Sequence, residues 1–95
     1  MATDKEYLTY ILDGLDKVKA RAMMGEYVLY CGGKVVGGLY DDRLLVKPTK
    51  SACALLPDAP KERPYEGAKE MLFVEETDDK AFLQSLLETV SRDLP

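Results

Sequence analysis

Apolar residues at the start of the chain recur with the period of a helix. This pattern predicts an amphipathic helix over Thr3–Leu15, which either Thr3 or Asp4 is suited to cap. From Lys17 to Met23 the period changes to two, and such alternation is typical of a half-exposed strand. The side chains on the apolar side of this strand are Val18, Ala20 and Ala22.

Three further strands are expected, separated by short turns. They cover Tyr27–Cys31, Lys34–Tyr40 and Arg43–Lys47, because residues that suit a pleated surface fill these segments. The turns are Met24-Gly25-Glu26, Gly32-Gly33 and Asp41-Asp42, and the glycine pair is the strongest signal of a two-residue hairpin. Gly37-Gly38 in the middle of a strand indicates a bulge or the close approach of another backbone.

The second half of the chain alternates helix and strand. A short helix through Ala52–Leu56, capped by Thr49 or Ser51, precedes a polar loop that three prolines mark as the most flexible segment. A brief strand starts at Glu70 or Met71 and ends at Val74. A final helix follows Thr77-Asp78-Asp79, with a buried stripe of Phe82, Leu83, Leu86, Leu87, Val90 and Leu94. The order α-β-β-β-β-α-β-α predicts an α+β fold, a two-layer sandwich of a mostly antiparallel sheet and packed helices.

Size and charge narrow the function classes. We expect the 95 residues to form a single domain over residues 1–95. The net charge of −4 gives no bias toward phosphate backbones, so direct nucleic-acid binding is not expected. No apolar run approaches the roughly 20 residues of a membrane span and the N-terminus lacks an export signal, so we expect a cytoplasmic protein without a membrane partner. Cys31 and Cys53 are expected to be free thiols that pack as small apolar groups.

The sequence has no histidine, the commonest general base and metal ligand. A Ser-His-Asp or Cys-His mechanism is therefore excluded, and we expect neither an enzyme nor a cofactor. Four acidic residues gather at Glu75, Glu76, Asp78 and Asp79. They lack the spacing of a calcium loop and suit a helix N-terminus, so no metal site is predicted.

Basic and aromatic residues remain as candidates for a binding surface. Lys17, Lys19 and Arg21 share one strand face, with Lys47 expected nearby in the sheet. They form either a solvated face, which we favour, or a patch for a phosphate or an acidic partner. Arg21 is also expected to pair with the Glu26 carboxylate. Four tyrosines are suited either to line a groove or to cover the sheet: Tyr27, Tyr30, Tyr40 and Tyr65.

Four stretches of the sequence carry a joint signature. They are R-x-M-M-G-E-Y-V-L-Y from Arg21 to Tyr30, G-K-V-V-G-G-L-Y-D-D-R-L-L-V-K from Gly33 to Lys47, Y-E-G-A-K from Tyr65 to Lys69, and M-L-F-V-E-E-T-D-D with the final helix. Together they resemble the TfoX/Sxy N-terminal domain family, named for a regulator of DNA-uptake competence that acts with the cyclic-AMP receptor protein. The resemblance implies a sandwich of the secretion-chaperone type and no enzymatic activity. Better-known members read M-F-G-G at positions 23–26 and carry a second, helical domain, whereas we expect a stand-alone N-terminal domain here.

The resemblance and the lack of catalytic groups predict a non-enzymatic module that contacts a protein partner, with the transcription machinery as a candidate. We expect its surface at the turn Arg21–Tyr27 and the loop Tyr65–Lys69, because the core does not require their charged and aromatic residues. The candidate site residues are Arg21, Glu26, Tyr27, Lys47, Tyr65 and Lys69.

Two alternatives remain open beside this module, and direct DNA binding is a third that the acidic net charge makes least favoured. One is a small-molecule or nucleotide sensor, in which Lys47 and Arg21 bind an anion beside Tyr27. A homodimer is also open, with Met23, Met24 and Gly37-Gly38 as candidate contacts.

Overall fold

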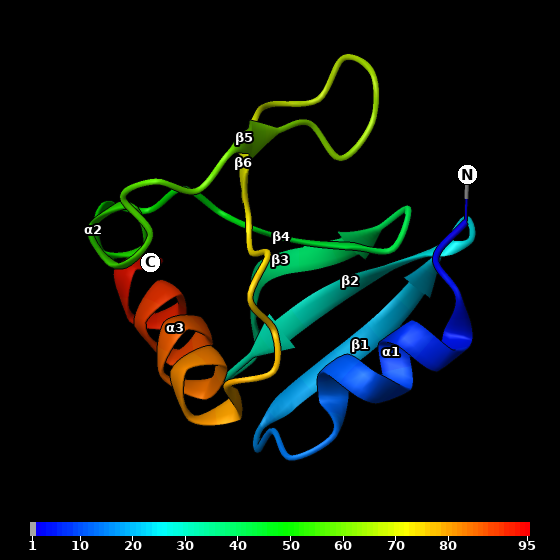
Figure 1. Cartoon of the computed structure of the whole chain (residues 1–95), viewed down its shortest axis with the longest axis horizontal. Helices are drawn as coiled ribbons and strands as arrows, with labels where there is room; N and C mark the ends of the chain where they lie inside the picture. Colours follow the sequence, from blue (N-terminus) through cyan, green and yellow to red (C-terminus); the bar gives the residue numbers. More distant parts are fainter. Residues whose placement is uncertain (1) are drawn as a thin grey trace.

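A six-stranded antiparallel sheet in the order β1-β2-β3-β4-β6-β5 is the centre of the fold. The computed structural model describes residues 2–95. The strands are β1 (Val18–Met23), β2 (Glu26–Cys31), β3 (Lys34–Tyr40), β4 (Arg43–Val46), β5 (Lys61–Glu62) and β6 (Met71–Phe73). Helices α1 (Lys5–Leu12) and α3 (Lys80–Asp93) lie on one side of the sheet, and α2 (Lys50–Leu55) packs against α3 (Figure 1).

The predicted α+β class is confirmed, with one additional strand. β5 lies in the segment that the sequence assigns to a flexible polar loop, where Lys61 and Glu62 pair with Leu72 and Met71. The Pro60 carbonyl also accepts a hydrogen bond of 2.8 Å from the Phe73 amide. A strand of two residues is too short to show an alternating pattern, so only its backbone pairing reveals it.

Side-chain caps define where the helices begin. The sequence leaves two candidates each for α1 and α2, and the structure selects Asp4, which accepts from the Glu6 amide, and Thr49, which accepts from the Ala52 amide. Asp79 caps α3 by accepting from the Phe82 amide. α1 is shorter than predicted because the helix ends at Leu12, and the chain then turns through Gly14 with φ of 81°.

Three tight hairpins connect β1 to β4. Both residues of Met24-Gly25, Gly32-Gly33 and Asp41-Asp42 have positive φ, between 53° and 86°. This is the geometry of type I′ turns, whose twist matches that of the flanking strands. The first turn is one residue shorter than predicted, because Glu26 already belongs to β2 and pairs with Met23.

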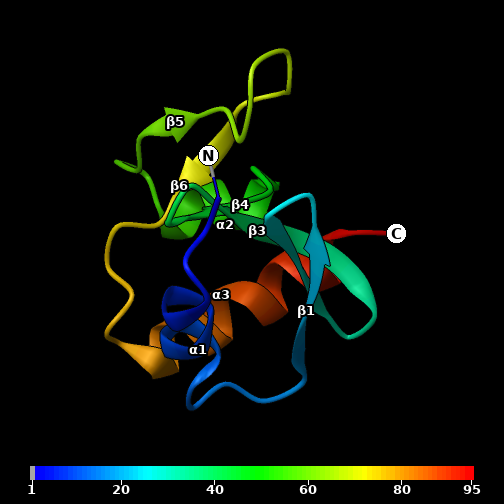
Figure 2. The ribbon, with the colours of Figure 1, turned by 90° about the vertical axis from the view of Figure 1, so that its right-hand side faces the viewer.

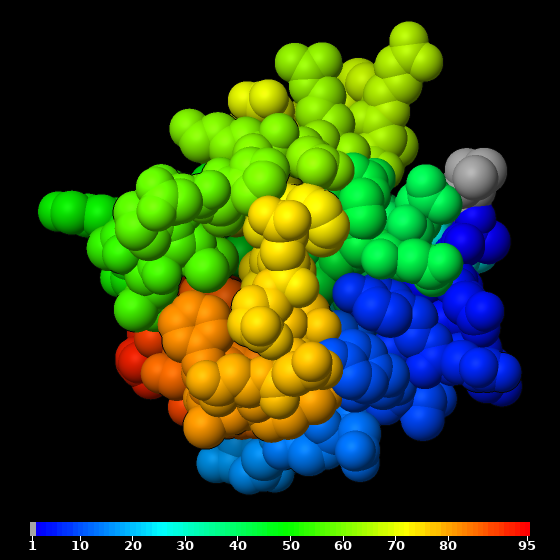
Figure 3. All heavy atoms as spheres, in the orientation of Figure 1, coloured from blue at the N-terminus to red at the C-terminus, as the bar shows by residue number. Residues whose placement is uncertain are grey.

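The face of the sheet toward α1 and α3 holds the core. Leu29, Leu39 and Val46 are fully buried here. Helix α3 adds Leu83, Leu86, Leu87 and Val90, with Phe82 and Leu94 packed at the margin of the core. In Figure 3, α1, α3 and the segment after β6 cover this side so closely that little of the sheet is visible.

The two cysteines are free thiols, as predicted, but they differ in burial. Cys31 is buried in the core, whereas Cys53 is exposed on α2. The expectation that Cys53 packs as an apolar group is wrong, because α2 buries Ala52 and turns the neighbouring residue outward.

Gly37 and Gly38 lie where β3 is most crowded. The register between β2 and β3 shifts at this point, so the predicted bulge is confirmed. A Cβ on Gly37 would overlap the Leu45 carbonyl oxygen, and one on Gly38 would lie 2.5 Å from Cε2 of Tyr40. The predicted close approach of a backbone is therefore also present, with β4 beside Gly37 and β2 beside Gly38.

Candidate functional site

Three exposed apolar side chains, Met23, Met24 and Tyr65, lie at the face of the sheet turned away from α1 and α3. Because side chains alternate along a strand, Tyr40 and Met71 point to this open face, while Leu39 and Leu72 point to the core. The loop of residues 63–70, between β5 and β6, stands out from this end of the sheet (Figures 1 and 2). It forms two adjacent hollows, which share Tyr40, Pro64 and Tyr65 as lining residues.

The first hollow, here called the methionine hollow, has a volume of about 640 Å³. Met23 and Met24 of the first turn line one side of it, and Tyr65 of the loop lines another. Met24 is 98% exposed and Tyr65 is 61% exposed, whereas Tyr40 between them is only 8% exposed. Flexible thioethers beside amphipathic rings are typical of surfaces that bind partners.

The second hollow, here called the lysine hollow, has a volume of about 420 Å³. Lys47 and Lys69 line it together with the rings of Tyr40 and Tyr65, whose centroids lie 6.3 Å apart at an interplanar angle of 59°. Glu70 lies at the same hollow. Two ammonium groups beside tilted aromatic rings are suited to an anionic group attached to a flat apolar body.

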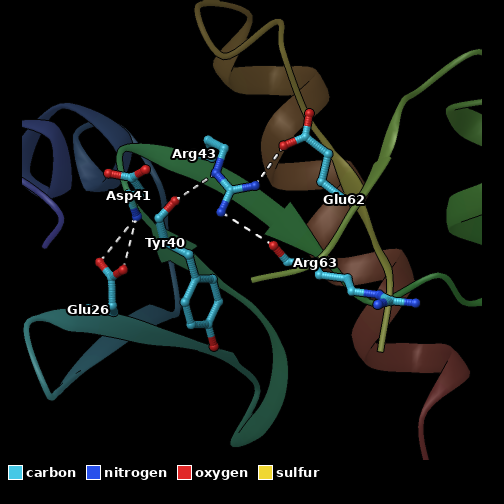
Figure 4. A network of polar contacts seen from close by, with 6 residues as sticks. All are labelled: Glu26, Tyr40, Asp41, Arg43, Glu62 and Arg63. Atoms are coloured by element: carbon cyan, nitrogen blue, oxygen red, sulfur yellow. Dashed lines mark hydrogen bonds and ion pairs between the residues drawn. The ribbon is translucent and has the colours of Figure 1, made fainter. Parts of the chain in front are cut away.

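Arg43 holds the loop against the sheet (Figure 4). Its Nη1 donates to Oε1 of Glu62 at 2.6 Å, its Nη2 donates to the Arg63 carbonyl at 3.4 Å, and its Nε donates to the Tyr40 carbonyl at 3.1 Å. The guanidinium thus joins the end of β3 to β5 and the start of the loop. Three donors in a fixed plane suit this task better than a single ammonium would.

Glu26 forms hydrogen bonds that hold two neighbouring segments of the site together. Both of its carboxylate oxygens accept from the Asp41 amide at 3.1 Å (Figure 4), and Oε1 also accepts from the Thr3 hydroxyl at 2.7 Å. The carboxylate therefore fastens the N-terminal segment and the Asp41-Asp42 turn together. The predicted ion pair between Arg21 and Glu26 is wrong, because in residues 2–95 the one ion pair joins Arg43 to Glu62.

The surroundings of Tyr40 on the open face shift the pKa of its phenol. Burial, followed by the neighbouring Tyr65 and Glu26, raises the pKa of its phenol above 10.0. Each cause disfavours the phenolate, so the ring remains neutral at physiological pH. Tyr40 is therefore an apolar floor with a neutral hydroxyl, and both hollows share it.

The structure brings together some of the candidate residues and separates others. Glu26 and Tyr65 line the methionine hollow, while Lys47, Tyr65 and Lys69 line the lysine hollow. Arg21 pairs with Val28 on the outer strand and lines a third hollow, with Lys19 and Tyr30. Tyr27 packs against the core on the helix side. The arrangement of Lys47, Arg21 and Tyr27 around one anion is therefore wrong, because the sheet places them on different strands and faces.

Sequence reasoning missed Arg43, and it named the two methionines individually only as candidate contacts of a dimer, although they lie within the predicted surface Arg21–Tyr27. Arg43 follows a two-residue turn and alternates with the buried Leu44, so its position in the strand predicts the open face. Its partner Glu62 lies on a strand that the pattern does not reveal. The pairing could therefore not be found before β5 was placed.

The comparisons with known proteins identify a family. The model of the TfoX N-terminal domain matches residues 10–85, from α1 into α3. The chain belongs to the TfoX N-terminal domain family. The family resemblance is thus confirmed, and the TfoX N-terminal domain is not a known enzyme family.

One relative of this TfoX N-terminal domain is an uncharacterized 12.7 kDa protein in the trpE 5′ region of Spirochaeta aurantia. It is 35% identical over 99 residues, which cover 100% of this chain and 86% of that protein. No solved structure matches the chain, so the likeness to secretion chaperones stays a prediction.

Two further properties bear on the class of site. Within residues 2–95, no helix has the length and apolar character needed to cross a membrane. In the same range, no three acidic or cysteine side chains converge in a way that would hold a metal ion. The side chains that do converge on the open face are aromatic, thioether, basic and acidic groups.

Proposed function

We propose that this TfoX N-terminal domain is a non-enzymatic, cytoplasmic interaction module that binds a protein partner in the methionine hollow. The observation that carries the proposal is the position of Met24 and Tyr65. Two exposed apolar side chains from segments far apart in the sequence flank the nearly buried Tyr40. A central anchor ring with exposed apolar neighbours is the usual composition of a binding hot spot.

The way in which the hollow is built supports the proposal. The type I′ turn holds Met24 outward with φ of 53°, in a conformation that a residue other than glycine seldom adopts. Arg43 and Glu62 hold the opposite wall by the ion pair of 2.6 Å. A preformed cavity loses less conformational entropy on binding than a mobile surface would.

The family relationship suggests the class of partner. The family is named for a competence regulator, and a component of the transcription machinery is the partner that this relationship favours. The net charge of −4 supports contact with a protein rather than with DNA itself.

The test is a quantitative capture of cell proteins by purified domains, followed by titration of each captured protein in purified form. We expect Met24→Glu and Tyr65→Ala each to weaken the purified interaction at least about tenfold, because each removes a contact of hot-spot size. Leu55→Glu is the matched control. Leu55 is also an exposed apolar residue, 42% exposed, but it lies on α2, away from the hollow.

Equal effects of Met24→Glu and Leu55→Glu would refute the placement of the site. The same conclusion would follow if no purified protein bound the wild-type domain. The folded state of each variant is checked by its thermal midpoint.

The lysine hollow favours a second candidate function, a sensor of a small anionic aromatic compound such as a nucleotide. Lys47 and Lys69 would contact the anion, and Tyr40 and Tyr65 would contact the ring. A ligand that binds only the folded state must raise its stability, so a nucleotide at a hundred times its dissociation constant would stabilise the domain by about 2.7 kcal/mol. A thermal-shift screen in which Lys47→Met and Lys69→Met do not abolish the stabilisation would eliminate this candidate.

A further inference from the structure

The outer strand β1 is an open edge of the sheet. Met23 and Glu26 flank a two-residue turn, so they form the hydrogen-bonded pair that closes the hairpin. Because hydrogen-bonded and non-hydrogen-bonded pairs alternate, the amides and carbonyls of Val18, Ala20 and Ala22 point away from β2. Figure 2 shows β1 at the margin of the sheet, with α1 to one side of it. Within residues 2–95, no backbone hydrogen bond from another segment reaches these three residues.

The side chains along this edge carry an unpaired positive charge. Lys19 and Arg21 are exposed and point to the open face, where their neighbours on β2 are Tyr30 and Val28. Lys17 lies next to the start of the strand, and the hollow that these cations line has a volume of about 520 Å³. The one ion pair in residues 2–95 involves none of them. A local positive edge on a chain with a net charge of −4 is a feature that the core does not require.

A second copy of the chain does not fit this edge. In a two-fold antiparallel pairing, the outward-facing Val18, Ala20 and Ala22 must lie opposite outward-facing residues of the other copy. The registers with the longest overlap place cations opposite cations: Lys19 against Arg21 when Ala20 is central, and Lys19 or Arg21 against itself when that residue is central. Like charges that face each other across strands destabilise the pair, and charged edge residues are a common defence against self-association.

We infer that β1 accepts an extended acidic segment of a partner protein as an additional antiparallel strand, at a surface distinct from the methionine hollow. The partner's backbone would bond to the free amides and carbonyls of Val18, Ala20 and Ala22. Its carboxylates, two residues apart, would lie opposite Lys19 and Arg21. Main-chain bonds then supply affinity, and the alternating acidic side chains supply selectivity.

The test uses an alternating Thr-Glu peptide that is long enough to span β1, titrated into the full chain while backbone amide signals are followed. We expect the signals of Ala20 and Ala22 to shift. The double variant Lys19→Glu/Arg21→Glu should weaken binding at least about tenfold, since two ion pairs become repulsive. The matched control is Lys5→Glu/Lys50→Glu, which changes the net charge equally at exposed helix starts and should bind as wild type.

A second variant separates strand addition from simple charge attraction. Ala20→Pro removes one outward amide, and proline is tolerated at an edge where the amide faces solvent. We expect it to weaken peptide binding at least about tenfold with both cations still present. If this variant does not fold, a peptide N-methylated at the amides that would face β1 replaces it, with the same expected loss.

Several outcomes would overturn the inference. They are no binding at millimolar peptide, equal losses in the two charge variants, and full binding by Ala20→Pro or the methylated peptide. Tighter binding of a short DNA duplex that Ala20→Pro does not affect would assign the edge to nucleic acid instead. A dimer that Lys19→Glu/Arg21→Glu strengthens would assign it to a second copy. Met24→Glu should leave peptide binding intact, so the result is independent of the methionine hollow.

Discussion

The two faces of the sheet are made of the same strands but differ in what they bury. On the helix-covered face, aliphatic side chains such as Leu29 and Leu39 are fully buried against α1 and α3. On the open face, Tyr40 is nearly buried beside the loop of residues 63–70, while Tyr65 and Met24 remain exposed around it. The first face provides most of the apolar burial that stabilises the fold, which leaves the second free to carry side chains suited to binding.

The largest expected difference in stability between the two faces is at neighbouring positions of β2. Leu29 is fully buried on the helix side, and Val28 is half-buried on the open face. We expect Leu29→Ala to lower the free energy of unfolding by about 2–5 kcal/mol, because it leaves a cavity in a packed core. Val28→Ala should cost about 1 kcal/mol or less, since that position is already partly solvated.

Urea denaturation measures both values, and an unchanged m-value would show that the unfolded states are comparable. Equal losses of unfolding free energy at the two positions would contradict the conclusion that only the helix-covered face forms the core. Position 28 would then belong to a second core rather than to a binding surface.

The crowding of Gly38 gives the next largest effect, and it sharpens the picture of the open face. An added Cβ would lie 2.5 Å from Cε2 of Tyr40 and 2.7 Å from the Tyr27 carbonyl oxygen. We expect Gly38→Ala to destabilise the domain by about 1–3 kcal/mol, the usual cost of overpacking. In the background of Tyr40→Val the same change should cost less, because the ring no longer opposes the new methyl group. Strict additivity in this double-mutant cycle would show that Tyr40 does not depend on the glycine.

The contact between Arg43 and Glu62 gives a smaller effect on stability. Both side chains are partly exposed, 24% and 35%, so Arg43→Met should cost about 1 kcal/mol or less. Its main consequence should be local, because the guanidinium also holds the Arg63 carbonyl. We expect Arg43→Met to speed amide hydrogen exchange in residues 63–70. The control is Lys61→Met, which changes an exposed residue of β5 next to Glu62. Unchanged exchange in the loop would mean that Arg43 does not hold the wall of the hollows.

The face that holds the core could be predicted from the sequence, because its signals are local. The apolar runs within residues 27–46 specify strands, and the helical stripe from Leu83 to Val90 specifies the buried side of α3. The paired turn residues specify tight hairpins and therefore the register of β1 to β4. Where a signal was weak, as at Lys61-Glu62, the strand was missed.

The open face was less predictable, because it depends on contacts between segments that are distant in sequence. The sequence shows that the first turn and the loop carry charged and aromatic residues, but nothing in these residues indicates that Met24 and Tyr65 line one hollow. The parity of Tyr27 in its strand places it beside Leu29, on the core side, and a stricter use of the alternation would have removed it from the candidates. The positions of Arg21 and Lys47 required the strand order, which the sequence does not specify.

The smallest expected effect is on the pH dependence of stability, and it tests whether the loop of residues 63–70 encloses Tyr40. The pKa of Tyr40 is raised above 10.0 by burial, by Tyr65 and by Glu26, so the folded state disfavours the phenolate. The folded state then holds its proton at a pH where the unfolded state has lost it. The resulting stability is fully present below pH 10 and is lost as the pH rises through the raised pKa of the folded state.

Tyr40→Phe should therefore make unfolding less dependent on pH above 10 and remove one late step from the tyrosinate absorbance titration. The pKa of Tyr7 is also raised, chiefly by burial, and that of Tyr10 by its hydrogen bond to Asp78, so late steps from these two residues should persist in this variant. Arg43→Met, which we expect to loosen the loop, should move the Tyr40 step toward lower pH by admitting water. If the titration of Tyr40 were the same with and without Arg43, the enclosure of this ring would come from β3 alone and the loop would not form a wall of the hollow.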